Sequence, residues 1–230
     1  MPGTGENTVN FIRLGWQDDP ERFREMATLH VAEIHHGALP LLGPRFLTRL
    51  YRELARAPGC GVWAMLREGR VGGFLIGCVD LKAGFRAVIL RAGLLLTALA
   101  IPRLLSWGLL RKLPALFLYP FRRAEEENSS ADIVYQDRAE LLVLAVAPDC
   151  RNQGAGQALI SCLESYLHDQ GKVSSYRVTT NAEDPVSNAF YKRVGFEPIG
   201  IRSHHALSLR HYRKRLPSRP SRSALWARAE

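Results

Sequence analysis

The chain has 230 residues, of which 47% are hydrophobic and 23% are charged, and it carries a formal net charge of +9. This length can bury a core, and this balance excludes a disordered chain, a collagen-like repeat and a small disulfide-linked scaffold. The positive charge is concentrated in two segments. Residues 81–124 hold eight basic residues and no acid, and residues 202–230 hold eight basic residues against Glu230 alone. We therefore expect two basic surfaces on a mildly acidic body.

The first third of the chain contains strand and helix signals in turn. Asp19 before Pro20 is typical of a helix start, because a carboxylate accepts from the first backbone amides and proline fits the first turn. Glu68-Gly69-Arg70 is typical of a hairpin turn between two apolar runs. In chain order, the predicted elements are a strand over 9–14, helices over 20–34 and about 44–57, and strands over 61–67 and 71–79.

The second half of the chain repeats this alternation. Residues 140–147 are almost wholly apolar, which is typical of a strand buried on both faces. The order predicts one α/β domain over residues 1–216 with a sheet of mixed direction, followed by a disordered Ser-, Arg- and Pro-rich tail over 217–230. The predicted elements are strand 140–147, helix 153–170, strand 174–180, helix 185–194, and strands near 196–201 and 206–213.

The turn after strand 140–147 carries the most informative motif. Arg151-x-x-Gly154-x-Gly156 lies between a buried strand and a helix, where glycines let a phosphate approach the free amides of the helix start. A Walker loop would need a lysine after Gly156, and a dinucleotide-binding fingerprint would need a small residue at Leu159. Both are excluded, which leaves a pyrophosphate site of another kind, with a plain strand–helix turn as the alternative.

Two segments together resemble the GNAT N-acetyltransferase superfamily. Arg151-x-x-Gly154-x-Gly156 resembles its acetyl-CoA motif, and Asn188-Ala-Phe-Tyr191-Lys-Arg-Val-Gly195-Phe196 resembles its N-x-[FL]-Y-x-x-x-G-F segment. The resemblance covers about residues 9–80 and 132–215. It implies a mixed, splayed β-sheet flanked by helices, with acetyl-CoA as the co-substrate and no metal.

The resemblance also assigns residues to the cofactor. The backbone of Leu144 and Val146 would pair with the pantetheine amides. Asn188 is a candidate for a further cofactor contact. The alternative is that Asn188 is an ordinary surface residue of its helix. The pyrophosphate would be held by residues Arg151, Asn152, Gln153, Gly154, Ala155, Gly156 and Gln157.

Two residues are candidates for the chemistry. Tyr191 would protonate the departing thiolate, and its alternative is an aromatic residue that packs the last helix. Glu140, at the mouth of the apolar strand, would take the proton from the attacking amine, because histone-acetylating members of the superfamily place their glutamate at this separation from the glycine motif. The alternative for Glu140 is a strand-end residue paired with Arg138 in solvent.

Histidines fall at two loops that line the acceptor site in this family. His35 and His36 lie between the first two helices, and His204 and His205 lie near the last turn, so His35, His36 and His204 are candidates for acceptor contacts. A solvated or packing role is the alternative for each pair. No histidine has convincing metal-ligand spacing.

The cysteines and the start of the chain indicate the compartment. No C-x-x-C pair and no zinc-ligand spacing is present, and Met1–Asn10 has no secretory pattern. We therefore expect a cytoplasmic protein in which all four cysteines are reduced and buried. These are Cys60, Cys78, Cys150 and Cys162.

Residues 81–131 form an apolar and basic insertion between the third and fourth predicted strands. Arg91 and Arg103 leave only eleven residues between them, so a transmembrane span of about 20 apolar residues does not fit. A single span would also put two halves of one sheet on opposite sides of a bilayer. The stretch 85–121 is expected to be a lid, a homodimer surface, or a pair of amphipathic helices on the inner face of an anionic membrane.

The sequence thus predicts an enzyme that transfers an acetyl group from acetyl-CoA directly to a primary amine. The first acceptor candidates are an amino sugar or another small metabolite. The alternatives are a protein lysine or N-terminal acetyltransferase, and a non-catalytic acyl-CoA-binding, membrane-associated module. The basic tail has a single aromatic, Trp226, and matches no nucleic-acid-binding module, so no nucleic-acid partner is expected.

Overall fold

The structure is a computed structural model that describes residues 9–35, 37, 39–105, 138–171, 173–204 and 207–216. Its first half contains β1 (Val9–Arg13), α1 (Pro20–Glu33), α2 (Leu39–Arg56), β2 (Cys60–Arg67), β3 (Arg70–Cys78) and α3 (Leu81–Leu105). Its second half contains β4 (Glu140–Val146), α5 (Ala155–Asp169), β5 (Ser175–Asn181), α6 (Pro185–Arg193), β6 (Glu197–His204) and β7 (Leu207–Arg215). The predicted alternation of strands and helices is confirmed, while the proposed tail over 217–230 lies outside the described residues.

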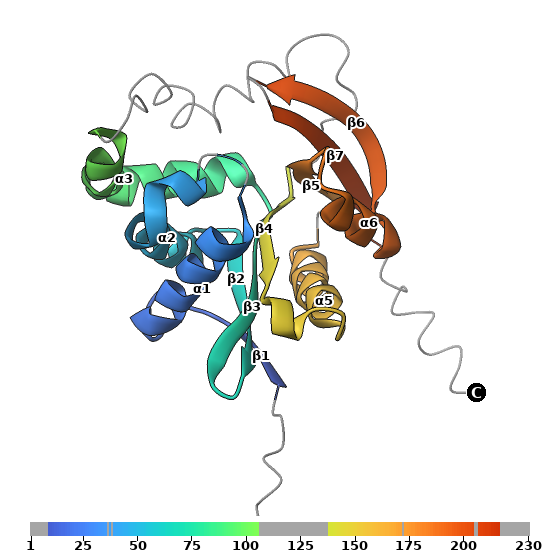
Figure 1. Ribbon diagram of the computed structural model, residues 1–230, viewed down its shortest axis with the longest axis horizontal. Helices are drawn as coiled ribbons and strands as arrows, with labels where there is room; N and C mark the ends of the chain where they lie inside the picture. Colours follow the sequence, from blue (N-terminus) through green and yellow to red (C-terminus); the bar gives the residue numbers. More distant parts are fainter. Residues whose placement is uncertain are drawn as a thin grey trace, which may run out of the picture.

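The seven strands form one mixed sheet in the order β1-β2-β3-β4-β5-β7-β6. Every neighbouring pair is antiparallel except β4 and β5. These two parallel strands pair only at Glu140 with Arg177 and at Leu141 with Val178, and then diverge (Figure 1). The sheet is therefore split along its middle, which confirms the mixed and splayed fold.

A β-bulge in β4 lies just beyond the last β4–β5 pair. Ile76 pairs with Val143 and Gly77 pairs with Leu141, so Leu142 is an extra residue opposite β3. Because of this extra residue, Leu142 and Val143 both pack into the core beneath α1–α3, while Leu141 packs into the core beneath α5. The bulge bends β4 where it leaves β5.

Helices cover the two faces of the sheet separately. α1, α2 and α3 lie on one face, and α5 and α6 lie on the other (Figure 1). Phe23 and Tyr51 are fully buried in the first core, and Leu163 and Tyr212 are fully buried in the second. Apolar side chains on both faces explain why β4 reads as a continuous apolar run.

The local signals for α1 and the hairpin are confirmed. Asp19 accepts a hydrogen bond from the Glu21 amide at 2.9 Å, and Pro20 begins α1. Glu68 and Gly69 both have positive φ angles, as a two-residue hairpin turn requires. Helix α2 begins earlier than predicted, because a short helical turn from Leu39 precedes a kink at Gly43, whose φ is 79°.

The insertion contributes one long helix, α3. It buries Val88, Ala92, Leu96 and Ala100, which recur every four residues, against the first core. By length and composition alone, Leu81–Pro102 is long and apolar enough to cross a membrane. Only 28% of its most apolar stretch is buried against the rest of the protein. The first part of 85–121 is thus helical as far as Leu105. Whether a second helix follows stays a prediction, because residues 106–131 lie outside the described residues.

The prediction of four reduced, buried cysteines is wrong in two respects. Cys60 and Cys78 form a disulfide, because the register of β2 and β3 makes them cross-strand neighbours with Cα atoms 4.1 Å apart. A separation of 18 residues in sequence gives no sign of this pairing. Cys150 is free and buried, whereas Cys162 is free but only partly buried.

Candidate active site

The turn between β4 and α5 presents backbone amides to solvent. Asn152 and Gly154 have positive φ angles of 60° and 81°, which turn the chain into α5 without a side-chain cap. The Ala158 amide makes the first hydrogen bond of the helix, 2.9 Å to the Gly154 carbonyl. The amides of residues 155–157 precede that bond and have no acceptor within the helix. Together with the helix dipole, such amides have the geometry that suits a phosphate oxyanion.

The two glycines of this turn serve different purposes. A Cβ atom at Gly154 would meet nothing within 4 Å, so that position is open to a ligand, and its φ favours glycine. A Cβ atom at Gly156 would lie 3.0 Å from the Phe190 ring. Gly156 therefore has a packing role, in which it allows α5 to approach α6, besides supplying an amide.

The polar side chains of the turn bind the protein itself. Nε of Arg151 donates to the Val146 carbonyl at 3.0 Å, and its guanidinium pairs with Glu33 at the end of α1. Nε2 of Gln153 donates to the Asp149 carbonyl at 2.9 Å. The structure thus gives these two side chains a positioning role and leaves the amides to contact a phosphate.

A cavity of about 230 Å³ adjoins the start of α5. Gln153, Gly154 and Ala155 line it together with Arg67 of β2, whose guanidinium donates to the Asp149 carbonyl at 3.2 Å. Sequence reasoning missed Arg67, because it ends a strand 84 positions before Arg151 and belongs to no motif. Its guanidinium lies beside the free amides and 3.5 Å from the Asp149 carboxylate.

The β5-facing edge of β4 is unpaired beyond the bulge. Leu144 pairs with Leu75 and Val146 pairs with Gly73, both on β3. Neither Leu144 nor Val146 pairs with a residue of β5. An extended chain carrying amide groups fits such an edge, because strand-like hydrogen bonds satisfy both partners. The predicted roles of Leu144 and Val146 have the backbone geometry that they need.

Tyr191 lies in an aromatic cluster beneath α6. Its ring centroid is 5.4 Å from those of Phe190 and Phe196 and 5.9 Å from that of Tyr212. Burial raises the pKa of the Tyr191 phenol well above its ordinary value, and the charge of Asp184 raises it further. The phenol is therefore protonated at physiological pH, as a proton donor must be, and its catalytic role stays a prediction.

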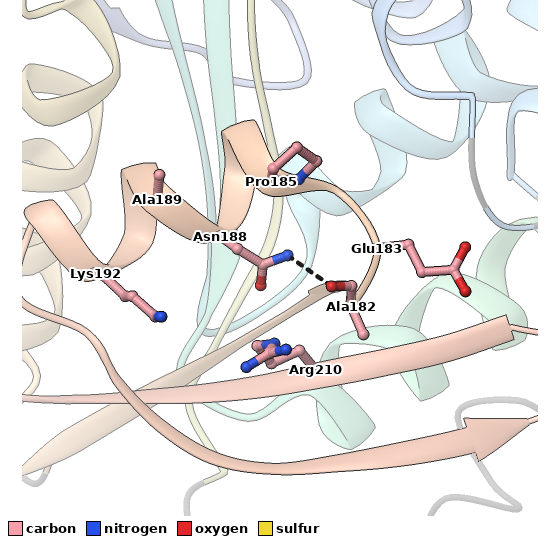
Figure 2. A pocket seen from close by; sticks show the side chains of 7 residues that line it. All are labelled: Ala182, Glu183, Pro185, Asn188, Ala189, Lys192 and Arg210. Atoms are coloured by element: carbon pink, nitrogen blue, oxygen red, sulfur yellow. Dashed lines mark hydrogen bonds between the residues drawn. The ribbon is translucent and has the colours of Figure 1, made fainter.

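Asn188 is buried and is committed to internal hydrogen bonds, so its expected cofactor contact is not supported and the surface alternative is wrong. Its Nδ2 donates to the carbonyls of Asn181 and Ala182 at 2.9 and 3.2 Å, and the second bond is visible in Figure 2. Its Oδ1 accepts from the Tyr212 hydroxyl at 2.8 Å. Asn188 thus fixes the start of α6 and the ring that packs on Tyr191.

Glu140 and Arg177 form a buried ion pair where β4 and β5 part. Nε of Arg177 lies 3.0 Å from the Glu140 carboxylate, and both side chains are at most 5% exposed. Pairing of Glu140 with Arg138 in solvent is therefore wrong, because Arg138 lies 3.6 Å from Asp80 instead. The carboxylate stands on the α1–α3 side of the sheet, opposite the face covered by α5.

Thr179 and His211 lie beside this pair and were missed by the sequence reasoning. Thr179 follows Val178, the last β5 residue paired with β4, and its Oγ1 lies 3.0 Å from Nδ1 of His211 on β7. His211 is 5% exposed. The available signal was the polar alternation Arg177-x-Thr179 in a buried strand.

The candidate acceptor histidines are only partly described. His35 is exposed after α1 and His204 ends β6, while His36 and the side chain of His204 lie outside the description. Their acceptor role stays a prediction. Among the described residues, no group of three or more His, Cys, Asp and Glu side chains gathers as metal ligands would.

The profile of the acetyltransferase (GNAT) family matches residues 28–196. The ribosomal-protein-S18-alanine N-acetyltransferase from Escherichia coli superposes with a TM-score of 0.55 at 13% identity, covering 94% of this chain and 98% of that one. The PaiA N-acetyltransferase from Thermoplasma acidophilum, solved with coenzyme A, gives 0.51 at 13% identity, with 90% and 99% covered. Ard1 from Thermoplasma volcanium gives 0.54 at 13% identity, with 91% and 99% covered. No curated protein sequence matches the chain.

Proposed function

The chain belongs to the GNAT acetyltransferase family, and we propose that it moves the acetyl group of acetyl-CoA directly to the primary amine of a small metabolite, an amino sugar being the first candidate. One observation carries this proposal. The unpaired edge of β4 connects the free amides at the start of α5 with a polar group formed by the buried Glu140, Arg177 and His211 and the partly buried Thr179. A long thioester with a pyrophosphate at one end suits such an edge.

Binding requires only groups that the fold already orients. The amides of residues 155–157 and the dipole of α5 would hold the pyrophosphate, with Arg67 beside them. The backbone of residues 142–146 would hold the pantetheine arm through strand-like hydrogen bonds. The thioester would then reach the point where β4 and β5 part.

The chemistry requires one proton acceptor and one proton donor. As the amine nitrogen bonds to the acetyl carbon and the carbon–sulfur bond breaks, the amine loses a proton and the thiolate gains one. Glu140 would accept the first proton, and Nε of Arg177, 3.0 Å away, orients its carboxylate. The Tyr191 phenol would donate the second and be reprotonated from solvent. Direct transfer needs no cysteine nucleophile.

Acceptor choice is tested by CoA release, corrected for hydrolysis, with amino sugars, amino acids and peptides under saturating acetyl-CoA. We expect turnover with an amino sugar to exceed that with lysine-containing or N-terminal peptides. Turnover with peptides alone would assign a protein substrate instead. Binding of acetyl-CoA without turnover of any amine would favour the non-catalytic module.

We also propose that α3 places the enzyme on the cytoplasmic face of an anionic membrane. Leu90 and Leu94 are 76% and 92% exposed, and Ile101, on the same face, is 45% exposed. Exposed Arg86 lies on this side of the helix, and no acid occurs between residues 81 and 124. An apolar stripe beside basic residues suits the headgroup region of anionic lipid better than open solvent. Because Cys60 and Cys78 form a disulfide, reduced thiols no longer support a cytoplasmic location. The remaining argument for the cytoplasmic face is that the enzyme needs a supply of acetyl-CoA.

Co-sedimentation with phosphatidylglycerol-containing vesicles tests this attachment. Wild-type protein should bind at low salt and dissociate as salt is added, whereas Leu90→Glu/Leu94→Glu should not bind. Val186→Glu is the matched control, because Val186 is 73% exposed on α6. Wild-type protein that stays in the supernatant at low salt, or that forms a dimer which Leu94→Glu dissociates, would overturn the membrane assignment.

A further inference from the structure

A second hollow lies between α6 and β7, apart from the proposed acetyl-CoA site. It has a volume of about 420 Å³, and Pro185, Ala189 and Lys192 of α6 line one side of it (Figure 2). Phe190, by contrast, points toward Gly156 of α5. The hollow therefore occupies the side of α6 that faces away from the start of α5.

Two cationic side chains enter this hollow from different elements. Lys192 comes from α6 and Arg210 from β7, and Figure 2 shows both at the same space. Neither makes an ion pair or a side-chain hydrogen bond with the part of the chain that the structure describes. Nε of Arg210 is buried and has no hydrogen-bond partner within the described ranges of the chain. A buried donor of this kind is costly unless an acceptor binds to it.

The rest of the lining leaves room for an acceptor from outside. Ala182, Pro185 and Ala189 are small and apolar, and the Asn188 side chain is already hydrogen-bonded to the protein. Glu183 is the single acid of the lining, and it points away from both cations in Figure 2. The hollow thus combines small walls with two positive charges that have no ion-pair partner among the described residues.

We propose that this hollow is a second binding site, for a phosphate or carboxylate group. The planar guanidinium of Arg210 presents paired donors to two oxygens, and Lys192 supplies a second charge from the opposite wall. The bound anion would satisfy the buried Nε of Arg210 and join α6 to β7. Because Asn188 forms part of the same wall and holds Tyr212, the anion would also brace the aromatic cluster around Tyr191.

Calorimetry on protein saturated with CoA tests the site, since CoA keeps the amides at the start of α5 occupied. Titration with inorganic phosphate and, separately, with succinate distinguishes the two anion classes. We expect Arg210→Met and Lys192→Met each to weaken binding of the preferred anion about tenfold or more. Arg193→Met is the matched control, because it removes the same charge from α6 on the side that stacks against Phe190.

The cofactor's own 3′-phosphate is a second source of the same chemistry. If it occupies the hollow, Arg210→Met will weaken CoA but not dephospho-CoA, and added phosphate will not bind to the CoA complex. If a free anion occupies the hollow, both cofactors bind all variants equally. The site is overturned if neither anion nor the 3′-phosphate depends on Arg210 and Lys192, or if Arg193→Met has the same effect. CoA affinity measured alongside reports on the proposed acetyltransferase site independently.

Discussion

The two ends of β4 offer a ligand different kinds of group. At the carboxyl end, an uncapped helix and a left-handed glycine expose backbone amides. At the amino end, the groups are side chains drawn from β4, β5 and β7, of which Glu140 and Arg177 are 37 residues apart. Backbone recognition leaves a short motif in the sequence. A site built from distant side chains leaves almost none.

The largest expected effect comes from a substitution at the carboxyl end of β4 that removes acetyl-CoA binding there and leaves the amino end unchanged. Gly154→Val adds a side chain in the open space before α5 at a φ of 81°, so acetyl-CoA affinity should fall more than about a hundredfold. Calorimetry measures it. Gly171→Val is the matched control, because Gly171 has a φ of 69° with open space around it and follows α5 at its other end. If both variants bind acetyl-CoA like the wild type, the amides before α5 do not hold the pyrophosphate.

A change at the proposed proton donor, Tyr191 of α6, should lower turnover and spare acetyl-CoA binding. Tyr191→Phe keeps the ring contacts and removes the proton donor, so kcat should fall on the order of a hundredfold with little change in acetyl-CoA affinity. Steady-state kinetics and calorimetry separate the two. Tyr166→Phe, which alters a ring packed on Trp63, is the control and should keep wild-type turnover. Equal turnover in both variants would leave Tyr191 a packing residue.

Substitution of Glu140 tests whether this residue is a catalytic base or only one partner of a structural ion pair. Glu140→Gln should remove the acidic limb of the pH–rate profile of kcat/KM, because the amide cannot accept a proton. It also removes the charge partner that Arg177 has on β4, which should lower the free energy of unfolding by about 3 kcal/mol. Urea denaturation measures that second effect. An unchanged acidic limb in a folded variant would transfer the base role to His211 or to water.

The sequence therefore predicts the fold and the carboxyl end of the site better than the amino end. Asp19, the turn at Glu68-Gly69 and Gly154 act through local backbone geometry, which a residue and its neighbours determine. The disulfide of Cys60 and the contact of Thr179 with His211 depend on strand register, which a single sequence does not specify. The internal hydrogen bonds of Asn188 could not be predicted either. A family motif names the residue but not the atoms that its side chain contacts.

The smallest expected effect separates the two glycines of the carboxyl end. Gly156→Ala places a Cβ atom 3.0 Å from the Phe190 ring, so α5 and α6 must move apart by a few tenths of an ångström. Overpacking of this size costs about 1 kcal/mol, and the better helix propensity of alanine offsets part of it. Acetyl-CoA affinity should stay near the wild-type value, because the amide of residue 156 remains. Thermal denaturation of Gly156→Ala/Phe190→Leu should regain most of the lost stability. A large loss of acetyl-CoA affinity in Gly156→Ala, unrelieved by Phe190→Leu, would mean that residue 156 faces the cofactor and that the two glycines serve one purpose.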